Sequence, residues 1–496
     1  MKKWGQILKH FTLNNFSIEI IIHCLIVFVS FCTYSYLFYP ALNSDHAVTI
    51  LMGNSFHLPN DWYFWGQDRM GSLIPMLAWP LINIFGCNAV VSESIAHYSI
   101  LVAGFLTFST FFKTPVYRIA LAVLWFLPPF RMADLMLLSF GIQYSIIAIL
   151  CYLAYKIYKF EGIIRLREIS KWYVPFGIIS IVGIWVSDLV AISATIMVVL
   201  LIYNTIKFNK INLKSHLKGW LTLVGFALAC YLFISYIKSD SLHHNYSEIA
   251  PLNIIESSIS ILFETIIQIF TFQANEPFTS AYSWLVLLLL TILVFLSRKS
   301  DIKITFVQWF LIIDALFILA AILVTKWTND NHVPRRYFTC TYVSFGISIL
   351  LYMEACEFKL KSKFNGLLII VLLTGGLGSI FNLKYIWPAT LKPRFEEISE
   401  LKKLGNVGII GDYWNSYICS IAEPDAIIST PHEASEVRNP LLVEKVFLQP
   451  TIYLVKDWWL ESFPDSITQF GRKLKASGNE FECGGLTLKK YEIEKF

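Results

Sequence analysis

Long apolar stretches separated by short polar loops fill the first 386 residues of the chain. A helix that crosses a bilayer needs about 20 predominantly apolar residues. The pattern therefore predicts a mainly α-helical, polytopic membrane bundle of about eleven transmembrane helices. The predicted spans lie at about 18–42, 93–112, 115–130, 134–157, 172–186, 189–206, 219–237, 283–298, 304–325, 337–353 and 365–386.

Two long polar loops, 43–92 and 238–282, interrupt this bundle. Each contains an amphipathic stretch, Ala47–Phe56 in the first loop and Asn253–Phe272 in the second. A helix with one apolar face and one polar face lies in the plane of the membrane interface. We therefore expect both stretches to lie flat on the membrane surface.

The composition changes near residue 387 to that of a water-soluble domain. Short apolar strands alternate there with helical patterns, which is typical of a small α/β domain with a partly parallel sheet. We therefore divide the chain into a bundle, 1–386, and a C-terminal domain, 387–496. The strands are predicted at 407–411, 425–430, 452–456 and 486–493, and the helices at 394–405, 412–422 and 466–478.

The composition agrees with a membrane protein. Hydrophobic residues make up 56% of the chain and charged residues only 15%, whereas soluble domains have about 25% charged residues. The aromatic content of 16% suits Trp and Tyr at membrane interfaces. The net charge of +5 comes from short loops, so it does not indicate a nucleic-acid partner.

Positive residues gather in alternate loops, which predicts the orientation of the chain. Cytoplasmic loops carry the excess of Lys and Arg, so we expect the N-terminus in the cytoplasm and, after an odd number of spans, the C-terminal domain outside. The first span lacks a small-residue cleavage site and is predicted to be an uncleaved anchor in the cytoplasmic membrane. The charges lie at Lys2, Lys3 and Lys9, at 156–171, at 207–218, at 298–303 and at 359–363.

Asp45 follows the first span directly, in the sequence Asn43-Ser44-Asp45-His46. One interpretation is a helix N-cap, because Ser and Asp are favoured at that position. The other is a general base at the membrane surface, since a carboxylate can take a proton from an acceptor hydroxyl or amine. The position alone does not decide between them.

The sequence Trp65-Gly66-Gln67-Asp68-Arg69-Met70-Gly71-Ser72-Leu73 follows in the same loop, and the next apolar run ends in Phe85-Gly86. Together with Asp45, this arrangement resembles the first outer loop of bacterial C-type (GT-C) membrane glycosyltransferases. That superfamily includes protein O-mannosyltransferases and aminoarabinose transferases. Two positions depart from it, because His46 and Ile74-Pro75 stand where relatives often have Glu.

The resemblance extends to two later segments. His332-Val333-Pro334-Arg335-Arg336-Tyr337-Phe338 resembles the Arg-Tyr motif that many relatives carry before a late span. Gly411-Asp412-Tyr413-Trp414-Asn415-Ser416-Tyr417 resembles the Asp-Tyr-Trp stretch that opens their outer domain.

The resemblance implies transfer of a sugar from a polyprenyl-phosphate-linked donor to a glycan, lipid or protein acceptor at the outer face. Asp45 is then the base of a single, inverting displacement. The resemblance does not supply a second acid, and we predict that Asp68 takes that place, where it orients substrate or helps to hold a divalent cation. Relatives differ in their use of metal, and no ligand set in this chain decides the matter.

Arg335 and Arg336 are predicted to bind the donor phosphate. Two Arg at a helix entrance also serve as membrane anchors, but the positive-inside rule disfavours them on the outer face. Guanidinium groups match phosphate oxygens in pairs, which favours the phosphate site. The other predicted substrate-binding residues are Gln67, Arg69, His332 and Tyr337, with Lys326 as a weaker member.

Three other classes of protein are alternatives to this one. The first is a structural or sensor protein with an outer domain, against which only the Gly-Gln and Met-Gly-Ser-Leu motif speaks. A transporter or flippase of lipid-linked saccharides would need a charged path through the bundle. A polysaccharide polymerase or ligase would place its chemistry on a late loop, whereas the motif-bearing loop here is early.

Several polar residues have no motif behind them. Asp314 lies inside a predicted span and is either a functional acid or a structural hydrogen-bonding group. Arg131, Asp134 and Asp188 suit tight turns that open on the outer side, and Glu248, Glu264 and Glu276 are candidates for substrate contact.

In the C-terminal domain, Asp412 is predicted to cap a helix, and Trp458 and Trp459 to pack against the membrane or the bundle. Cys419 and Cys483 would pair only if that face is oxidising.

Overall fold

The computed structural model describes residues 2–160, 165–207, 213–239, 248–273, 276–297, 303–357, 363–381 and 392–494. This part of the chain forms two compact units, each assembled from separate segments. The helical unit comprises Met1–Phe31, Ile100–Ser235 and Asn245–Tyr385. The mixed unit comprises Cys32–Ser99, Tyr236–His244 and Ile386–Phe496. The division of the sequence into 1–386 and 387–496 stays a prediction.

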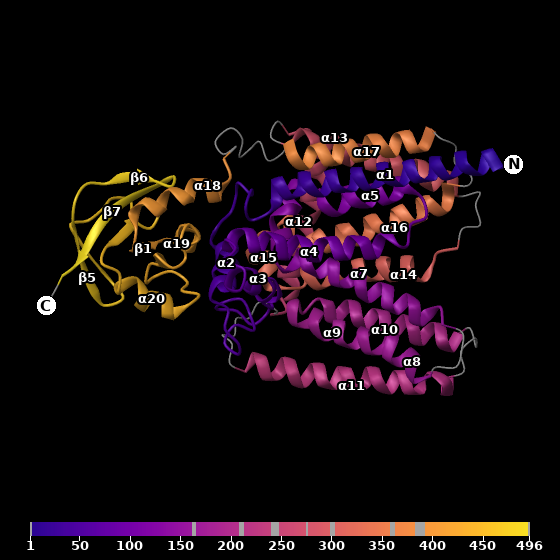
Figure 1. Ribbon diagram of the computed structural model, residues 1–496, viewed down its shortest axis with the longest axis horizontal. Helices are drawn as coiled ribbons and strands as arrows, with labels where there is room; N and C mark the ends of the chain where they lie inside the picture. Colours follow the sequence, from indigo (N-terminus) through magenta and orange to yellow (C-terminus); the bar gives the residue numbers. More distant parts are fainter. Residues whose placement is uncertain are drawn as a thin grey trace. The chain divides into compact units, whose positions relative to one another are not determined.

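Long helices make up the helical unit and run alongside one another (Figure 1). Helix α14 packs on α16, α13 on α17, and α7 on both α9 and α10. The helices that lie in this unit wholly or in part are α1 (Lys2–Tyr34), α4 (Ala89–Ser109), α5 (Pro115–Phe126), α6 (Phe130–Ala133), η1 (Asp134–Leu137), α7 (Ser139–Tyr158), α8 (Leu166–Glu168), η2 (Ile169–Tyr173), α9 (Val174–Val186), α10 (Val190–Lys207), α11 (Leu213–Lys238), α12 (Leu252–Phe270), α13 (Pro277–Ser297), α14 (Phe306–Leu323), α15 (Lys326–Asp330), η3 (Arg335–Phe338), α16 (Thr339–Glu357) and α17 (Lys363–Phe381).

Within the described residues, eight helices are long and apolar enough to cross a membrane, and several shorter apolar helices accompany them. Each of the predicted spans overlaps one of these helices, so the predicted fold class, a polytopic bundle with a C-terminal α/β domain, is confirmed. The chain is a multi-pass membrane protein.

Of the two predicted flat interfacial helices, the first is wrong and the second stays a prediction. The stretch Asn253–Phe272 forms α12, which by its length and composition is itself a candidate span. The stretch Ala47–Phe56 belongs to α2 (Ser44–Ser55), most of whose residues are buried. For α2, the alternation of polar and apolar residues does not indicate contact with a membrane surface, because most of the helix is buried in the protein. In α2 it reflects packing against other elements of the mixed unit.

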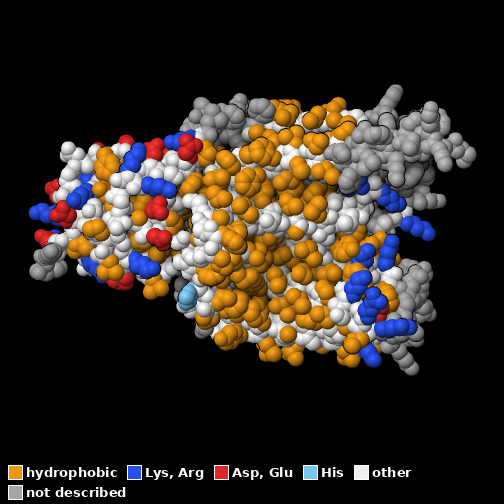
Figure 2. Space-filling model, viewed as in Figure 1, with side chains coloured by type: hydrophobic (Ala, Val, Ile, Leu, Met, Phe, Trp, Pro, Cys, Tyr) orange, Lys and Arg blue, Asp and Glu red, His pale blue; other side chains and the backbone are white. Residues whose placement is uncertain are grey.

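Apolar side chains cover the visible face of the helical unit, and Lys and Arg side chains gather at the end that carries α8 (Figure 2). A belt of apolar surface with charges at one end is typical of a bundle that crosses a bilayer. The orientation itself stays a prediction, and Lys210, Arg298, Lys299, Lys359 and Lys361 lie outside the described residues.

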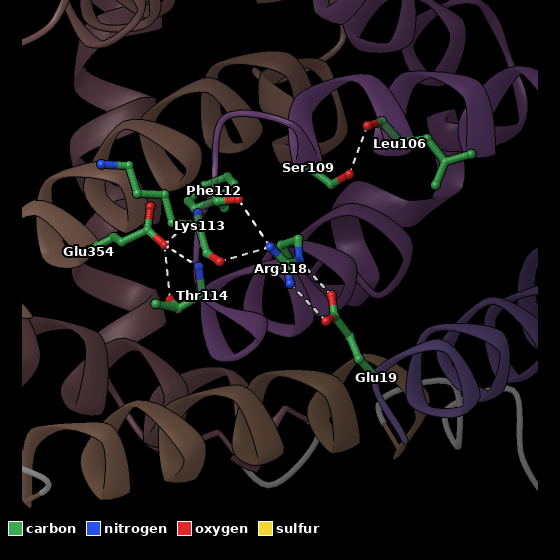
Figure 3. Close-up of polar contacts among 8 residues, drawn as sticks. All are labelled: Glu19, Leu106, Ser109, Phe112, Lys113, Thr114, Arg118 and Glu354. Carbon is green, nitrogen blue, oxygen red and sulfur yellow. Dashed lines mark hydrogen bonds and ion pairs between the residues drawn. The ribbon is translucent and has the colours of Figure 1, made fainter. Parts of the chain in front are cut away.

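An ion pair joins α1 to α5 in this unit. Glu19 accepts two hydrogen bonds from Arg118, one of them from Nη2 at 2.8 Å (Figure 3). The side chain of Glu19 is only 8% exposed and that of Arg118 is 24% exposed. Arg118 also donates to the carbonyl groups of Phe112 and Lys113, so its guanidinium is held by several acceptors at once.

We expect Glu19→Leu to lower the free energy of unfolding by about 3 kcal/mol, because it leaves a largely buried guanidinium without its carboxylate. Thermal unfolding in detergent measures the change. The double variant Glu19→Leu/Arg118→Leu should be more stable than the single one, since it removes both charges. A Glu19→Leu protein as stable as the wild type and the double variant would show that the ion pair contributes little to the free energy of unfolding.

The mixed unit contains α2, α3 (Leu73–Asn83) and the C-terminal α/β domain. Its sheet has the strand order β2-β1-β3-β7-β5-β4, with β6 paired to β7. Strands β2, β1 and β3 are parallel, and the remaining pairs are antiparallel. The elements of this domain are α18 (Arg394–Ile398), η5 (Ser399–Leu404), β1 (Val407–Gly411), α19 (Tyr413–Ser420), β2 (Ile427–Pro431), α20 (Pro440–Phe447), β3 (Ile452–Val455), β4 (Ser466–Gln469), β5 (Arg472–Ala476), β6 (Phe481–Cys483) and β7 (Leu486–Ile493).

Most of the predicted elements of this domain are present, and one is wrong. The segment 466–478 is not a helix but contains the hairpin β4–β5, in which Gln469 pairs with Arg472. Phe470 and Gly471 form its two-residue turn, with φ of 51° and 71°, as a hairpin turn of that length requires. Leu474 is fully buried while its neighbours are not, so the period is that of a strand.

Apolar residues of the strands and of α20 form the core of the α/β domain, including Ile410, Leu454, Leu474 and Tyr491. Trp459 packs against this core, and the predicted contact of Trp458 and Trp459 with the membrane or the bundle stays a prediction. Cys419 and Cys483 are both free thiols.

Candidate functional site

Asp45 is the second residue of α2 and does not cap it. The cap is Asn43, whose side-chain oxygen accepts the Asp45 N–H at 3.1 Å. His46 returns the interaction, since its Nδ1 accepts the Asn43 N–H at 3.3 Å. The capping interpretation of Asp45 is therefore wrong, and its half-buried carboxylate is available for other contacts.

Tyr413 of α19 binds that carboxylate. Its hydroxyl donates to Asp45 Oδ1 and accepts from Arg438 Nε at 3.2 Å. Arg438 also lies over the Tyr413 ring, with its guanidinium carbon 5.2 Å from the ring centre. Burial and the negative charge of Asp45 raise the pKa of Tyr413 well above its usual value, although Arg438 opposes this. Tyr413 is therefore a hydrogen-bond donor to Asp45 at neutral pH.

Arg438 connects this group to the motif of the first loop. Its side chain is only 7% exposed and pairs with Glu436 at 2.7 Å, and its Nη1 lies 3.5 Å from the Gly66 carbonyl. Gly66 has φ of 70°, and a Cβ there would lie 3.0 Å from Arg438 Cδ. The close approach and the backbone conformation together explain a glycine at this position.

Asp61 organises the rest of the loop. Its carboxylate accepts the backbone N–H of His57 at 2.6 Å and the indole N–H of Trp65 at 2.8 Å, and Ser72 donates to its carbonyl oxygen. The buried Gln67 accepts from Arg69 Nε at 3.2 Å, and the half-buried Asp68 lies between them in the chain. The predicted residues Gln67, Asp68 and Arg69 thus belong to the same unit as Asp45.

A second polar group lies in the helical unit and is centred on Glu276. Its carboxylate accepts from Arg131 Nε at 2.9 Å and from Arg335 Nη1 at 2.7 Å. The Glu276 side chain is 6% exposed, whereas that of Arg335 is 20% and that of Arg131 is 53% exposed. Burial alone would raise the pKa of Glu276, but Arg131 and Arg335 outweigh burial and lower it. Two guanidinium groups and one carboxylate therefore give these three side chains a formal net charge of +1.

This group lines one cavity, and a second cavity adjoins the first. The first, of about 120 Å³, is lined by Arg131, Glu276 and Arg335. The second, of about 240 Å³, has an almost entirely apolar lining from α5, α13, α16 and α17. Four residues line both cavities: Pro129, Tyr282, Tyr342 and Gly375. Both cavities thus have a mainly apolar lining, and the first one also has two arginines and a glutamate in its wall.

The other predicted phosphate-site residues surround Arg335 in sequence. His332 is exposed, and Tyr337 accepts from Trp327 Nε1 at 3.1 Å. The half-buried Arg336 lies 5.8 Å from the Tyr337 ring centre. His332 and Val333 both have positive φ, 57° and 49°, which is rare for residues other than glycine and rarest for a β-branched one. Such conformations are concentrated at functional sites.

The predicted site residues therefore fall into two groups, one in each unit. Asp45, Gln67, Asp68 and Arg69 belong to the mixed unit, and His332, Arg335, Arg336 and Tyr337 to the helical unit. That the two groups face one cavity stays a prediction. In the described part of the chain, no three His, Cys, Asp or Glu side chains are arranged to hold a metal ion.

Several residues of these groups were missed or undervalued in the sequence. Arg131 was assigned to a turn, and Glu276 had no motif. The sequence places Tyr413 in a motif but assigns it no role, and it gives no sign of a role for Arg438. Residues that form an ion pair from separate loops give no local pattern in the sequence. Only the aromatic motif around Tyr413 indicates any of these residues. The side chain of Asp134 lies outside the described residues.

No protein-family model and no curated protein matches this chain. Among solved structures, ArnT from Cupriavidus metallidurans bound to undecaprenyl phosphate matches with a TM-score of 0.57 and 9% identity, covering 96% of this chain and 98% of that one. The same protein in the apo state matches with a TM-score of 0.45 and 8% identity, over 97% and 98% of the two chains. An oligosaccharyltransferase from Archaeoglobus fulgidus matches with a TM-score of 0.45 and 11% identity, over 88% and 69%. The first match shows that the chain has the GT-C fold that its sequence predicts.

Proposed function

We propose that this protein is a membrane glycosyltransferase that uses a polyprenyl-phosphate-linked sugar donor. The observation that carries the proposal is the apolar cavity adjoining the Arg131–Glu276–Arg335 group. An isoprenoid chain would occupy the apolar cavity, and its phosphate would lie at the two guanidinium groups. ArnT, which has the same fold, was solved with undecaprenyl phosphate bound.

The contacts of Glu276 suit this role. Its carboxylate holds both arginines at the cavity before any ligand arrives. The two guanidinium groups would then meet a phosphate anion from fixed positions, which reduces the cost of ordering the side chains on binding. As the sugar departs, negative charge collects on the phosphate, and the same groups would stabilise it. His332, Arg336 and Tyr337 complete the proposed donor site.

Asp45 is the proposed general base. It would take the proton from an acceptor hydroxyl or amine while that atom attacks the anomeric carbon and the bond from this carbon to the phosphate oxygen breaks. A single displacement of this kind inverts the anomeric centre. Tyr413 and Arg438 would position the carboxylate. Asp68, Gln67 and Arg69 would contact substrate, and Asp68 is the proposed ligand if a divalent cation takes part.

We also propose the topology that the loop charges predict. The protein would lie in the cytoplasmic membrane with its N-terminus in the cytoplasm, and residues 387–496 would form an extracytoplasmic domain beside a catalytic bundle of residues 1–386. The acceptor would then be a glycan, lipid or protein at the outer face.

Mass spectrometry of envelope lipids, glycans and proteins from cells with and without the protein tests the function. We expect one sugar modification to be lost and its polyprenyl-phosphate-linked donor to accumulate at the outer face. Accumulation of the donor at the inner face instead would indicate a flippase. Unchanged lipids, glycans and proteins would contradict the proposal.

Tyr413→Phe should lower kcat for transfer about 10-fold and leave the donor KM unchanged. The variant removes one charge-assisted hydrogen bond to Asp45, which is worth about 1.5 kcal/mol. Steady-state kinetics of the reconstituted enzyme measures both constants. The matched control is Tyr417→Phe, which removes the same group one helical turn away, where the hydroxyl accepts from the backbone of Arg438 and Asn439. An equal fall in kcat in both variants would indicate a structural role only.

A further inference from the structure

The three parallel strands of the C-terminal domain end at one edge of the sheet, and a polar side chain follows each of them. Asp412 follows β1, His432 follows β2, and Asp457 lies two residues after β3. In open α/β sheets, ligands bind outside the carboxyl ends of the parallel strands. We call Asp412, Asn415, His432, Asp457 and Trp458 the sheet-edge cluster.

Hydrogen bonds join four of these residues into one network. The fully buried Asp412 accepts the Asn415 N–H at 2.8 Å and the Trp458 indole N–H at 3.1 Å. Asp457 accepts from the Asn415 side chain and, at 2.6 Å, from the Trp458 N–H. Burial, with the charge of Asp457 added, raises the pKa of Asp412. The predicted helix cap at Asp412 is confirmed, but the carboxylate also anchors the indole.

Trp458 is exposed although it is held in place. Its side chain is 71% exposed, while its indole N–H and its backbone N–H are both hydrogen-bonded to carboxylates. Its neighbour Trp459 is different, because it packs against the core and donates to the Val455 carbonyl at 3.2 Å. A large aromatic side chain fixed at the surface is a preorganised contact for a ligand.

His432 adds an independent sign of a ligand. It is only 7% exposed, and its Nε2 has no hydrogen-bond partner among the described residues. The ring stacks on Trp459 with centres 4.5 Å apart and lies 6.2 Å from that of Trp458. Buried polar atoms are normally hydrogen-bonded, so an unpaired nitrogen beside an exposed Trp indicates a missing partner.

We propose that the sheet-edge cluster binds a saccharide. A sugar ring would stack on Trp458, and its hydroxyl groups would donate to Asp457 and bond to Asn415 and His432, because carboxylate oxygens and amides are acceptors of such donors. The carboxylates disfavour an anionic ligand and an anionic membrane surface. Tyr413, which contacts Asp45, directly follows Asp412. If the proposed function holds, the cluster is a binding site for the acceptor glycan.

Saturation-transfer NMR on the full-length protein in detergent tests this with two neutral probes, maltotetraose and chitotetraose, each titrated to roughly 20 mM without any donor, a range that detects weak binding. We expect at least one probe to bind, and Trp458→Ala to raise its Kd roughly 10-fold or more, as removing a central Trp contact does. Asp457→Asn should also weaken binding. The control Leu448→Ala removes an exposed apolar side chain of the same domain and should leave the Kd unchanged.

Absence of binding by both probes, or equal binding by wild type and Trp458→Ala, would overturn the proposal. So would a loss of binding to phosphatidylglycerol vesicles in Trp458→Ala while saccharide binding persists, since Trp458 would then be a membrane contact. The assay needs no transfer. Saccharide binding that depends on Trp458 in a protein without transferase activity would therefore refute the proposed function and leave this inference standing.

Discussion

We expect Asp45→Asn to lower sugar transfer by roughly 10²- to 10⁴-fold, the usual contribution of a positioned general base. Asn has the same shape as Asp, and its carbonyl oxygen can still accept the Tyr413 hydroxyl that binds Asp45. The substitution therefore removes basicity and keeps the contact. Transfer from a polyprenyl-phosphate-linked donor to envelope acceptors, measured in proteoliposomes, gives the rate.

Two measurements separate the loss of a base from a loss of structure. The Asp45→Asn variant should bind polyprenyl phosphate as the wild type does, and its thermal unfolding should shift little. The control Asp425→Asn changes an exposed acid of the same unit, which accepts a hydrogen bond from Asn54, and should keep full activity. Full activity in Asp45→Asn would remove this residue from the mechanism.

Arg335→Gln should weaken the binding of polyprenyl phosphate by roughly 10- to 100-fold. A hydrogen bond between charged groups is worth about 1.5–3 kcal/mol, and Arg335 is the less exposed of the two arginines at the cavity. Native mass spectrometry or a lipid-competition assay with undecaprenyl phosphate measures the affinity. Arg131→Gln should have a smaller effect of the same sign, since Arg131 is 53% exposed.

Glu276→Gln distinguishes a ligand site from a structural ion pair. If the arginines bind the phosphate, loss of the competing carboxylate should leave the affinity for polyprenyl phosphate unchanged or raise it, at some cost in stability.

The control for Arg335→Gln is Arg472→Gln, which removes a positive charge from a surface pair with Glu444 and should bind polyprenyl phosphate normally. Unchanged affinity in Arg335→Gln would mean that Arg335 only anchors its helix.

The membrane helices could be predicted because a bilayer leaves the backbone few alternatives. Each apolar stretch must satisfy its own hydrogen bonds, so length and composition are enough. The same information failed for 466–478, where the turn requires positive φ at Phe470, a residue that rarely adopts it. It failed again for Ala47–Phe56, because an amphipathic pattern does not distinguish a helix on a membrane surface from one packed within the protein.

The candidate site could be predicted only where a local pattern carried it. Asp45, Gln67 and Asp68 stand in a recognisable loop, and Arg335 in a short motif. Their partners come from distant segments, as with Arg131 and Glu276, which are 145 residues apart. Which acid meets which base is decided by how the helices pack, and one sequence holds no record of that.

The hydrogen bond between Tyr413 and Asp45 joins residues 368 positions apart, which has a consequence for the order of synthesis. A ribosome inserts the loop that carries Asp45 well before it releases α19. Until then, the carboxylate lacks its tyrosine and Arg438. A nascent chain, or one that terminates before α19, would thus lack the hydrogen bonds of this group, and only a chain extended past Arg438 could form all of them.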